Sequence, residues 1–160
     1  MSELTHFDEQ GRSRMVDVSR KEDTVRVATA MGGVLMSPDT FRLVMDRKMS
    51  KGDVFEVARL AGIMGAKKAS GLIPLCHPLN ISSVEVHFHP DEEKSFIGIE
   101  ATVKVTGKTG VEMEALTAVS AAGLTVYDMC KAVDKRMVIT DIRLIEKSGG
   151  RSGHFRREEA

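Results

Sequence analysis

Asp128 and Lys131 are the two residues whose types and spacing most directly suggest chemistry. They stand three residues apart in a predicted helix, so a carboxylate and an ammonium group share one helix face. Glu114, fourteen residues earlier, projects within about 40° of the same direction at 3.6 residues per turn. The pair could transfer protons, or it could be an ordinary exposed ion pair worth about 0.2–0.5 kcal/mol. These residues alone leave both interpretations open.

The segment Gly107–Gly110, with the sequence GKTG, opens the same predicted helix and resembles part of a phosphate-binding loop. A Walker A loop also requires a glycine five positions before its Gly-Lys-Thr, and position 102 is Thr102. We therefore exclude a P-loop nucleotide hydrolase. The N-terminus of a helix still favours negative charge. Together with the acid–base pair, it favours chemistry on a phosphorylated substrate.

Several further cations and one histidine lie in predicted turns or at helix ends. His77 precedes Pro78, which restricts the backbone and fixes the direction of the His77 side chain. Lys67 lies in the last turn of a predicted helix, where a cation is favoured by about 0.3–1 kcal/mol without any function. Lys51 suits a flexible turn, and Lys147 precedes small residues whose N–H groups can surround an anion. Each could contribute to a site or simply be solvated.

The composition predicts one domain with no general affinity for polyanions. The chain has 160 residues, with 23 Lys plus Arg and 23 Asp plus Glu, so no overall field attracts nucleic acid or a membrane. It has no apolar run near 18 residues and a polar N-terminus, which predicts a cytoplasmic protein. Cys76 and Cys130 are not in CxxC spacing, and we expect free thiols.

Hydrophobic periodicity predicts an α+β fold. We expect strands at 25–36, 84–89, 97–105 and 136–147, and helices at 38–49, 54–70 and 111–134. This order is that of a ferredoxin-like split βαβ sandwich, with an antiparallel sheet and helices packed on one face. Residues 25–147 would form that domain, between a flexible N-terminal arm (1–24) and a flexible Gly-rich C-terminal tail (148–160).

The apolar positions also predict which side chains the two long helices bury. For the second helix, the expected stripe is Val54, Val57, Ala58, Ala61, Met64 and Ala66. For the last helix, it is Leu116, Val119, Val126, Cys130 and Val133. Small residues at 118, 121, 122 and 123 would allow another element to approach the last helix closely, and we infer an oligomer.

Two other classes of function are weighed against an enzyme. An RNA-binding module would stack bases on sheet aromatics, but the strand SFIGIEATV has only Phe96. A metal-binding or scaffold protein could use Cys76, His77, His87 and His89. No HxxxH or CxxC pairing supports a metal site, and strand alternation already accounts for His87 and His89.

Several strings together resemble one known family, that of molybdenum cofactor biosynthesis protein C. They are MVDVS (15–19), KGDVF (51–55), GLIPLCHPL (71–79), TGKTGVEMEALTA (106–118), YDMCKA (127–132) and EKSGG (146–150). The similarity runs from about residue 3 to 157, and the joint occurrence of these strings is highly specific.

The resemblance implies a ferredoxin-like subunit of a homohexamer, a trimer of dimers with active sites at subunit interfaces. It implies a lyase, cyclic pyranopterin monophosphate synthase. The substrate would be (8S)-3′,8-cyclo-7,8-dihydroguanosine 5′-triphosphate, supplied by a radical enzyme, and pyrophosphate would be released. We expect no redox cofactor, no resident metal, and no nucleic-acid or membrane partner. A divalent cation accompanying the triphosphate is compatible with this scheme.

The resemblance also assigns residues. Asp128, Lys131 and Lys51 match the catalytic positions, and the substrate-binding positions are Leu75, Cys76, His77, Met113, Glu114, Lys67, Arg26 and Lys147. We expect Asp128 and Lys131 to move protons. We expect the remaining cations and His77 to bind or neutralise the triphosphate, because expulsion of pyrophosphate requires positive charge around the leaving group.

Overall fold

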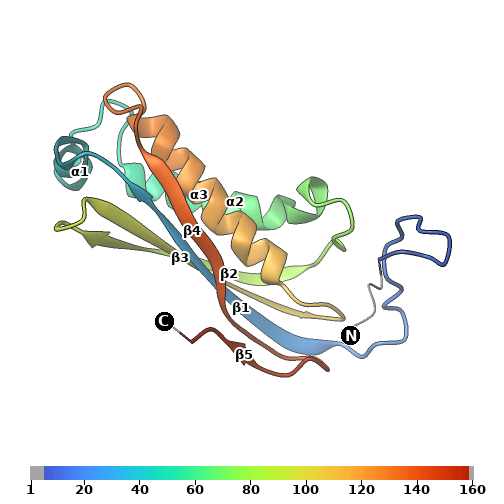
Figure 1. The fold of residues 1–160 in the computed structure, drawn as a ribbon. Helices are drawn as coiled ribbons and strands as arrows, with labels where there is room; N and C mark the ends of the chain where they lie inside the picture. The colour runs from blue at the N-terminus through green and yellow to red at the C-terminus, as the bar shows by residue number, and fades with distance from the viewer. Residues whose placement is uncertain (1–5, 159–160) are drawn as a thin grey trace.

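The computed structural model describes residues 6–158 and has an α+β architecture (Figure 1). Its elements are β1 (Thr24–Leu35), α1 (Pro38–Met45), α2 (Val54–Leu72), β2 (Ile81–Asp91), β3 (Phe96–Gly107), α3 (Glu112–Cys130), β4 (Val138–Ser148) and β5 (Phe155–Arg156). The predicted α+β class is confirmed, as is the β2–β3 hairpin, in which Phe88 pairs with Ile99.

The strands form one sheet in the order β2-β3-β1-β4-β5, and all neighbouring strands are antiparallel. The order of the first four strands is compatible with a ferredoxin-like fold. As Figure 1 shows, α2 and α3 lie on the same side of the sheet. The long helix α3 packs on β1, β3 and β4, whereas α2 packs on α3 and β2.

Alternation along the strands separates a core face from an outer face. In β1, Ala28, Ala30 and Val34 are buried beneath the helices, whereas Val25 and Leu35 are exposed. The register of β1 against β4 shifts between Met31 and Gly33, at the glycine pair Gly32–Gly33. The outer face of the sheet therefore retains apolar side chains that the described chain does not bury.

Two predicted helix ends were wrong. The first helix ends at Met45 and not near Met49, because Asp46 caps it and Arg47 adopts a left-handed conformation with a φ of 56°. The last helix ends at Cys130 and not near Asp134. Val133 lies in the turn that follows and is exposed, so its predicted place in the core was also wrong.

The buried stripe of α2 also differs from the prediction. Val57 and Met64 are exposed, and buried Gly62, Gly65 and Ala69 take their place. The reason is the close approach of the two long helices: a Cβ at position 65 would lie 2.7 Å from the Cβ of Ala121. This confirms that small residues on the last helix admit a close neighbour, and the neighbour is α2.

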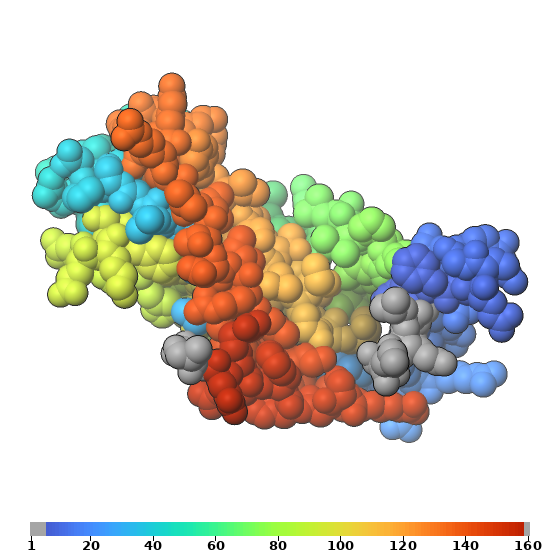
Figure 2. Space-filling model, in the orientation of Figure 1, coloured from blue at the N-terminus to red at the C-terminus, as the bar shows by residue number. Residues whose placement is uncertain are grey.

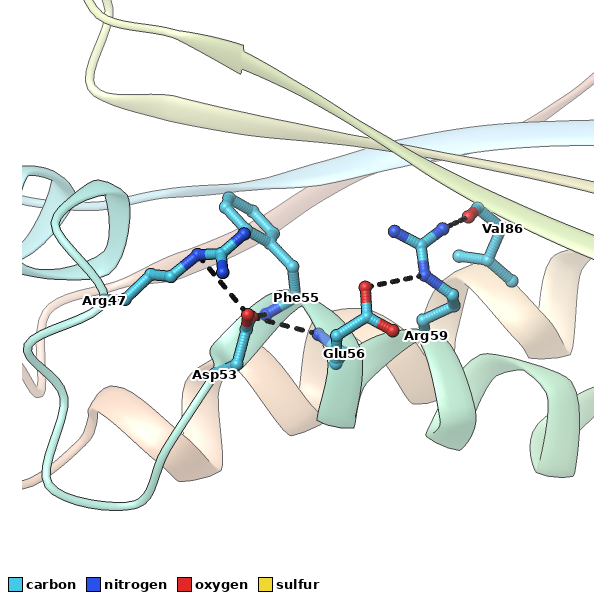
Figure 3. A network of polar contacts seen from close by, with 6 residues as sticks. All are labelled: Arg47, Asp53, Phe55, Glu56, Arg59 and Val86. Carbon is cyan, nitrogen blue, oxygen red and sulfur yellow. Dashed lines mark hydrogen bonds and ion pairs between the residues drawn. The ribbon is translucent and has the colours of Figure 1, made fainter.

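The beginning of α2 is fixed by a polar network that joins it to β2 (Figure 3). The carboxylate of Asp53 accepts hydrogen bonds from the backbone N–H groups of Phe55 (3.0 Å) and Glu56 (3.3 Å), as an N-cap should. Arg59 contacts the Glu56 carboxylate at 3.2 Å and donates to the Val86 carbonyl in β2. The capped end thus orients the loop that carries Lys51.

The chain termini are partly structured in the described residues. Phe155 pairs with Lys147 and Arg156 with Glu146, which adds β5 to the edge of the sheet. Near the other terminus, the N–H of Arg14 donates to the carbonyl of His6 at 2.8 Å. Figure 2 shows this N-terminal segment (blue) as a lobe at one end of the molecule, next to the segment that follows α2 (green).

We expect Asp134→Ala to lower the free energy of unfolding by about 1–3 kcal/mol, because two N–H groups would lose their acceptor. The Asp134 side chain accepts from Ser37 N–H and Arg136 N–H, each at 2.9 Å. The hydrogen bond from Ser37 contributes most to holding the pKa of Asp134 below 3.8. Urea unfolding at fixed protein concentration measures the change.

The pH dependence gives a second test of the same group. A lowered folded pKa means that this stabilisation is present above the unfolded value of 3.8 and is lost as the pH falls through the folded value. The difference between the wild type and Asp134→Ala should therefore shrink from about pH 7 toward about pH 3. A difference that stays constant over this range would contradict the assignment, and exposed Asp39→Ala serves as the control.

Candidate active site

Lys51, Asp128 and Lys131 meet at the C-terminal end of α3, and we call them the acid–base cluster. Lys131 Nζ lies 2.7 Å from Asp128 Oδ1, and Lys51 Nζ lies 3.2 Å from Asp128 Oδ2. Lys51 also donates to the backbone carbonyl of Asp128 at 2.9 Å. The turn between α1 and α2 brings Lys51 to this point, 77 residues away in sequence.

The charges of the acid–base cluster are well defined. The hydrogen bond from Lys131, followed by that from Lys51, lowers the pKa of Asp128. The hydrogen bond to Asp128 raises the pKa of Lys131. The cluster therefore holds one carboxylate and a protonated Lys131 near neutral pH. About half of each side chain is exposed, so these charges are readily available to a bound molecule.

A second group of predicted residues lies at the opposite end of α3. Leu75, Cys76, His77 and Met113 line a cavity of about 510 Å³, which we call the loop cavity. Its walls come from the loop after α2, from the start of α3 and from the N-terminal segment. The prediction that this loop displays His77 is therefore consistent with the structure, although His77 Nε2 is already engaged by the carbonyl of Val16 at 2.8 Å.

Glu114 is buried next to the loop cavity, in contact with Cys76. It is only 2% exposed, and the Cys76 thiol donates to its Oε1 at 3.6 Å while Oε2 has no partner among the described residues. Burial raises the pKa of the Glu114 carboxyl, and burial together with Glu114 raises that of Cys76 to about 11. Both groups thus favour their protonated forms. A buried acceptor without a partner costs about 1–3 kcal/mol, which is typical of a site kept for function.

Arg26 and Lys147 lie beside the same end of α3. Lys147 Nζ contacts Glu112 Oε1 at 2.7 Å and Ser152 Oγ at 3.2 Å. Arg26 donates through Nε and Nη2 to the carbonyls of Gly107 (2.9 Å) and Lys108 (3.1 Å). These contacts hold both cations in place. Arg26 is bonded to the turn that precedes α3, and Lys147 is bonded to Glu112, the first residue of α3.

The N-terminal segment closes over this end of the protein. Besides the His77 contact, Lys108 Nζ donates to the carbonyl of Ser19 at 2.8 Å. Lys21 lines the loop cavity together with Glu112. Our sequence analysis missed Lys21 and Glu112 as site residues. The signal for Glu112 was its place in the first turn after GKTG, next to two residues that we had already singled out.

One chain does not bring all the predicted residues together. Glu114 and Asp128 are fourteen residues apart on one helix, which places them about 21 Å apart at 1.5 Å per residue. The acid–base cluster and the loop cavity are therefore separate within a subunit. Lys67 is exposed on α2 and, in the described part of the chain, lines neither of them.

The other candidate ligands are dispersed. His87 Nε2 lies 3.6 Å from Glu85 Oε2, and His89 Nε2 lies 3.8 Å from Glu100 Oε2. All four side chains are on the outer face of the hairpin. Residues 6–158 contain no group of three or more His, Cys, Asp or Glu side chains placed to hold a metal ion. Both cysteines are free thiols, as expected. No helix in the described residues is long and apolar enough to cross a membrane.

We expect Glu114→Gln to leave the free energy of unfolding unchanged or to raise it by up to about 1 kcal/mol near pH 8, because it removes a buried acid whose ionisation opposes folding. A raised folded pKa means that the stability contributed by the neutral acid is lost as the pH rises through that value. The difference should therefore be smaller near pH 5. Urea unfolding checks this, with exposed Glu56→Gln as control. A clear loss of stability at pH 8 would refute a neutral, unpaired Glu114.

Comparison with known proteins gives a consistent result over nearly the whole chain. The model of the MoaC family matches residues 15–150. Cyclic pyranopterin monophosphate synthase of Heliobacterium modesticaldum is 66% identical over 159 residues, which cover 99% of this chain and 100% of the relative. The proteins of the same name from Magnetococcus marinus and Desulfitobacterium hafniense are 62% and 61% identical, covering 99% and 98% of this chain and 97% and 96% of theirs. The chain belongs to the MoaC family.

Proposed function

We propose that the protein is a cyclic pyranopterin monophosphate synthase, a lyase of molybdenum cofactor biosynthesis. It converts (8S)-3′,8-cyclo-7,8-dihydroguanosine 5′-triphosphate to cyclic pyranopterin monophosphate and pyrophosphate. The family membership supports this assignment. The structural observation that carries it is the acid–base cluster, in which two lysines hold the carboxylate of Asp128 between them at 2.7 and 3.2 Å.

The acid–base cluster suits the rearrangement half of the reaction. Opening a purine-derived ring and closing it as a pterin requires repeated proton transfers, and a positioned acid or base speeds each of them by about 10² to 10⁴. Asp128 is the proton acceptor and Lys131 the donor, since the directions of their pKa shifts keep Asp128 ionised and Lys131 protonated before the reaction. Lys51 holds Asp128 ionised and in position. The reaction requires no net electron transfer, and hence no redox cofactor.

The opposite end of α3 suits the phosphate half. A hydroxyl oxygen of the sugar-derived ring attacks the α-phosphorus, its proton passes to a base, and the bond to the bridging oxygen breaks as pyrophosphate leaves with the electron pair. Cations stabilise the charge on the leaving group. Arg26, Lys147 and His77 serve this role within one subunit, whereas Lys67, exposed on α2, serves it where a second subunit brings it to the site. A divalent cation can accompany the triphosphate without a protein ligand set.

We further propose that two copies complete each active site. The acid–base cluster of one subunit faces the loop cavity of another, which brings together groups that lie about 21 Å apart on one helix. The subunit is then ferredoxin-like, and the assembly is a homohexamer built as a trimer of dimers. Exposed apolar side chains such as Leu60, Met64 and Leu124 supply surface for these contacts. We place the protein in the cytoplasm, downstream of a radical enzyme that supplies its substrate.

For Asp128→Ala and Lys131→Ala, we expect loss of turnover by at least about 10²-fold with folding retained, because each removes one proton-transfer group. Pyrophosphate release and the fluorescence of the oxidised pterin product measure the rate. The matched control is Asp39→Ala, which breaks another exposed i,i+3 ion pair, with Arg42 on α1. Wild-type rates in either test variant would remove that residue from the mechanism. Absence of both products with folded wild-type protein would refute the proposed function.

A further inference from the structure

Residues 46–53, which we call the Lys51 loop, connect α1 to α2. The loop begins at a helix end of the Schellman type, in which the N–H groups of Arg47 and Lys48 donate to carbonyls in the last turn of α1 at 3.1 and 3.0 Å. Such an end places one residue in the left-handed conformation. In this chain that residue is Arg47, with a φ of 56°.

Arginine is an unusual residue for this position. The left-handed conformation is strained for a residue with a side chain and unstrained for glycine, which is the usual residue at this place in a helix end. The helix end does not need the Arg47 side chain, because its hydrogen bonds join only main-chain atoms. A side chain that is kept at a strained position indicates a use for that side chain.

The Arg47 side chain reaches across the loop to the start of α2 (Figure 3). Its Nε lies 3.5 Å from Oδ2 of Asp53, while Oδ1 of the same carboxylate accepts from the N–H groups of Phe55 and Glu56. The two oxygens of Asp53 therefore have different roles. One caps α2, and the other joins the start of α2 to the residue that follows the cap of α1, so the ion pair connects the two ends of the Lys51 loop.

Between these ends, the loop turns toward the end of α3. The N–H of Gly52 donates to the carbonyl of Met49 at 3.1 Å, and Gly52 has a φ of 99°, which glycine adopts without strain. Met49 is buried and anchors the turn, whereas residues 50–52 are exposed. From this turn, Lys51 Nζ reaches Asp128, at 2.9 Å from its carbonyl oxygen and 3.2 Å from Oδ2. The exposed turn alone gives the lysine little support.

We propose that Arg47 is a positioning residue that closes the Lys51 loop by pairing with Asp53 and thereby holds Lys51 on Asp128. The ion pair is exposed, with 76% of the Arg47 side chain accessible, so it adds little to the stability of the whole fold. Its effect is local, because a loop that is joined at both ends has fewer conformations to occupy. The kinetic consequence rests on the proposed function, in which Lys51 keeps Asp128 ionised and in position.

Lys48 provides a comparison within the same loop. Its Nζ lies 2.9 Å from Oδ2 of Asp46, which is closer than Arg47 lies to Asp53. Both residues of this second pair lie at the α1 end, so their contact does not span the loop. If the charge of the loop were decisive, the two pairs would be equivalent. If closure is decisive, only the pair of Arg47 with Asp53 affects Lys51.

Competitive acetylation of the full-length protein, read by mass spectrometry, tests the proposal without turnover. The measured quantity is the reactivity of Lys51 relative to that of exposed Lys94, whose own pair with Asp91 is not altered. Arg47→Gly should raise this ratio by about two- to fivefold, the change in population that an exposed ion pair produces. Its thermal unfolding midpoint should stay the same or rise, because the left-handed strain is removed. Arg47→Lys should recover part of the protection of Lys51.

A double-mutant cycle assigns the effect to the ion pair. Asp53→Asn keeps a good N-cap and removes the charge, so it should raise the reactivity of Lys51 as much as Arg47→Gly does. Arg47→Gly/Asp53→Asn should give no further rise, because both changes break the same contact. The matched control, Lys48→Ala, should react like the wild type. Equal reactivity of Lys51 in Lys48→Ala and Arg47→Gly, or additive effects in the cycle, would overturn the proposal.

Turnover gives the second readout. In Arg47→Gly, kcat for pyrophosphate release should fall by about two- to fivefold with KM unchanged, because fewer molecules hold Lys51 on Asp128. An unchanged kcat, or a rise in KM alone, would contradict a positioning role. If the wild type has no activity but the acetylation pattern is as expected, the proposed function fails while the closure of the Lys51 loop by Arg47 stands.

Discussion

The packing of α2 against α3 is the constraint on which the rest of the arrangement depends. Buried glycines and alanines let the two helices approach closely, and α3 in turn lies on the three central strands. This contact fixes the turn before α2, which carries Lys51, against the C-terminal end of α3. It equally fixes the loop after α2, which carries Cys76 and His77, against the N-terminal end. The packing of this helix pair therefore positions two groups of residues with different chemistry, one at each end of α3.

The two ends hold charge in opposite ways. At the C-terminal end, exposed groups stay ionised because they pair with each other. At the N-terminal end, Glu114 is buried, lacks a partner for one oxygen and favours its neutral form. Neither the exposed ion pair nor the buried acid is needed for folding. An exposed ion pair adds little to the stability of the fold, and a buried acid without a full set of partners lowers it. Both are understandable if a second subunit and a substrate meet these groups.

Much of the fold could be predicted from local patterns, because strand alternation and capping residues act over a few positions. Ser37 and Asp53 cap α1 and α2, and both helices begin at the predicted residues, 38 and 54. The predictions that were wrong depend on contacts distant in sequence. Val57 and Met64 were predicted to be buried. They are exposed because α2 packs closely on α3 through Gly62 and Gly65 instead. Val133 is exposed because α3 ends at Cys130, and the residue that follows Val133, Asp134, bonds Ser37, 97 residues away. The family resemblance assigned Lys51 and Asp128 to one site, and spacing alone could not have shown that they are in contact.

The central claim, that each active site combines the two ends of α3 from different subunits, has a direct test. Asp128→Ala and Lys147→Ala are each purified, dissociated, mixed and reassembled, and pyrophosphate release is measured before and after mixing. If one subunit supplies Asp128 and its neighbour Lys147, random pairing restores one intact site in each mixed dimer, and roughly a quarter of wild-type activity returns. If mixed assemblies form but remain as inactive as the separate variants, each site lies within one chain and the account is wrong.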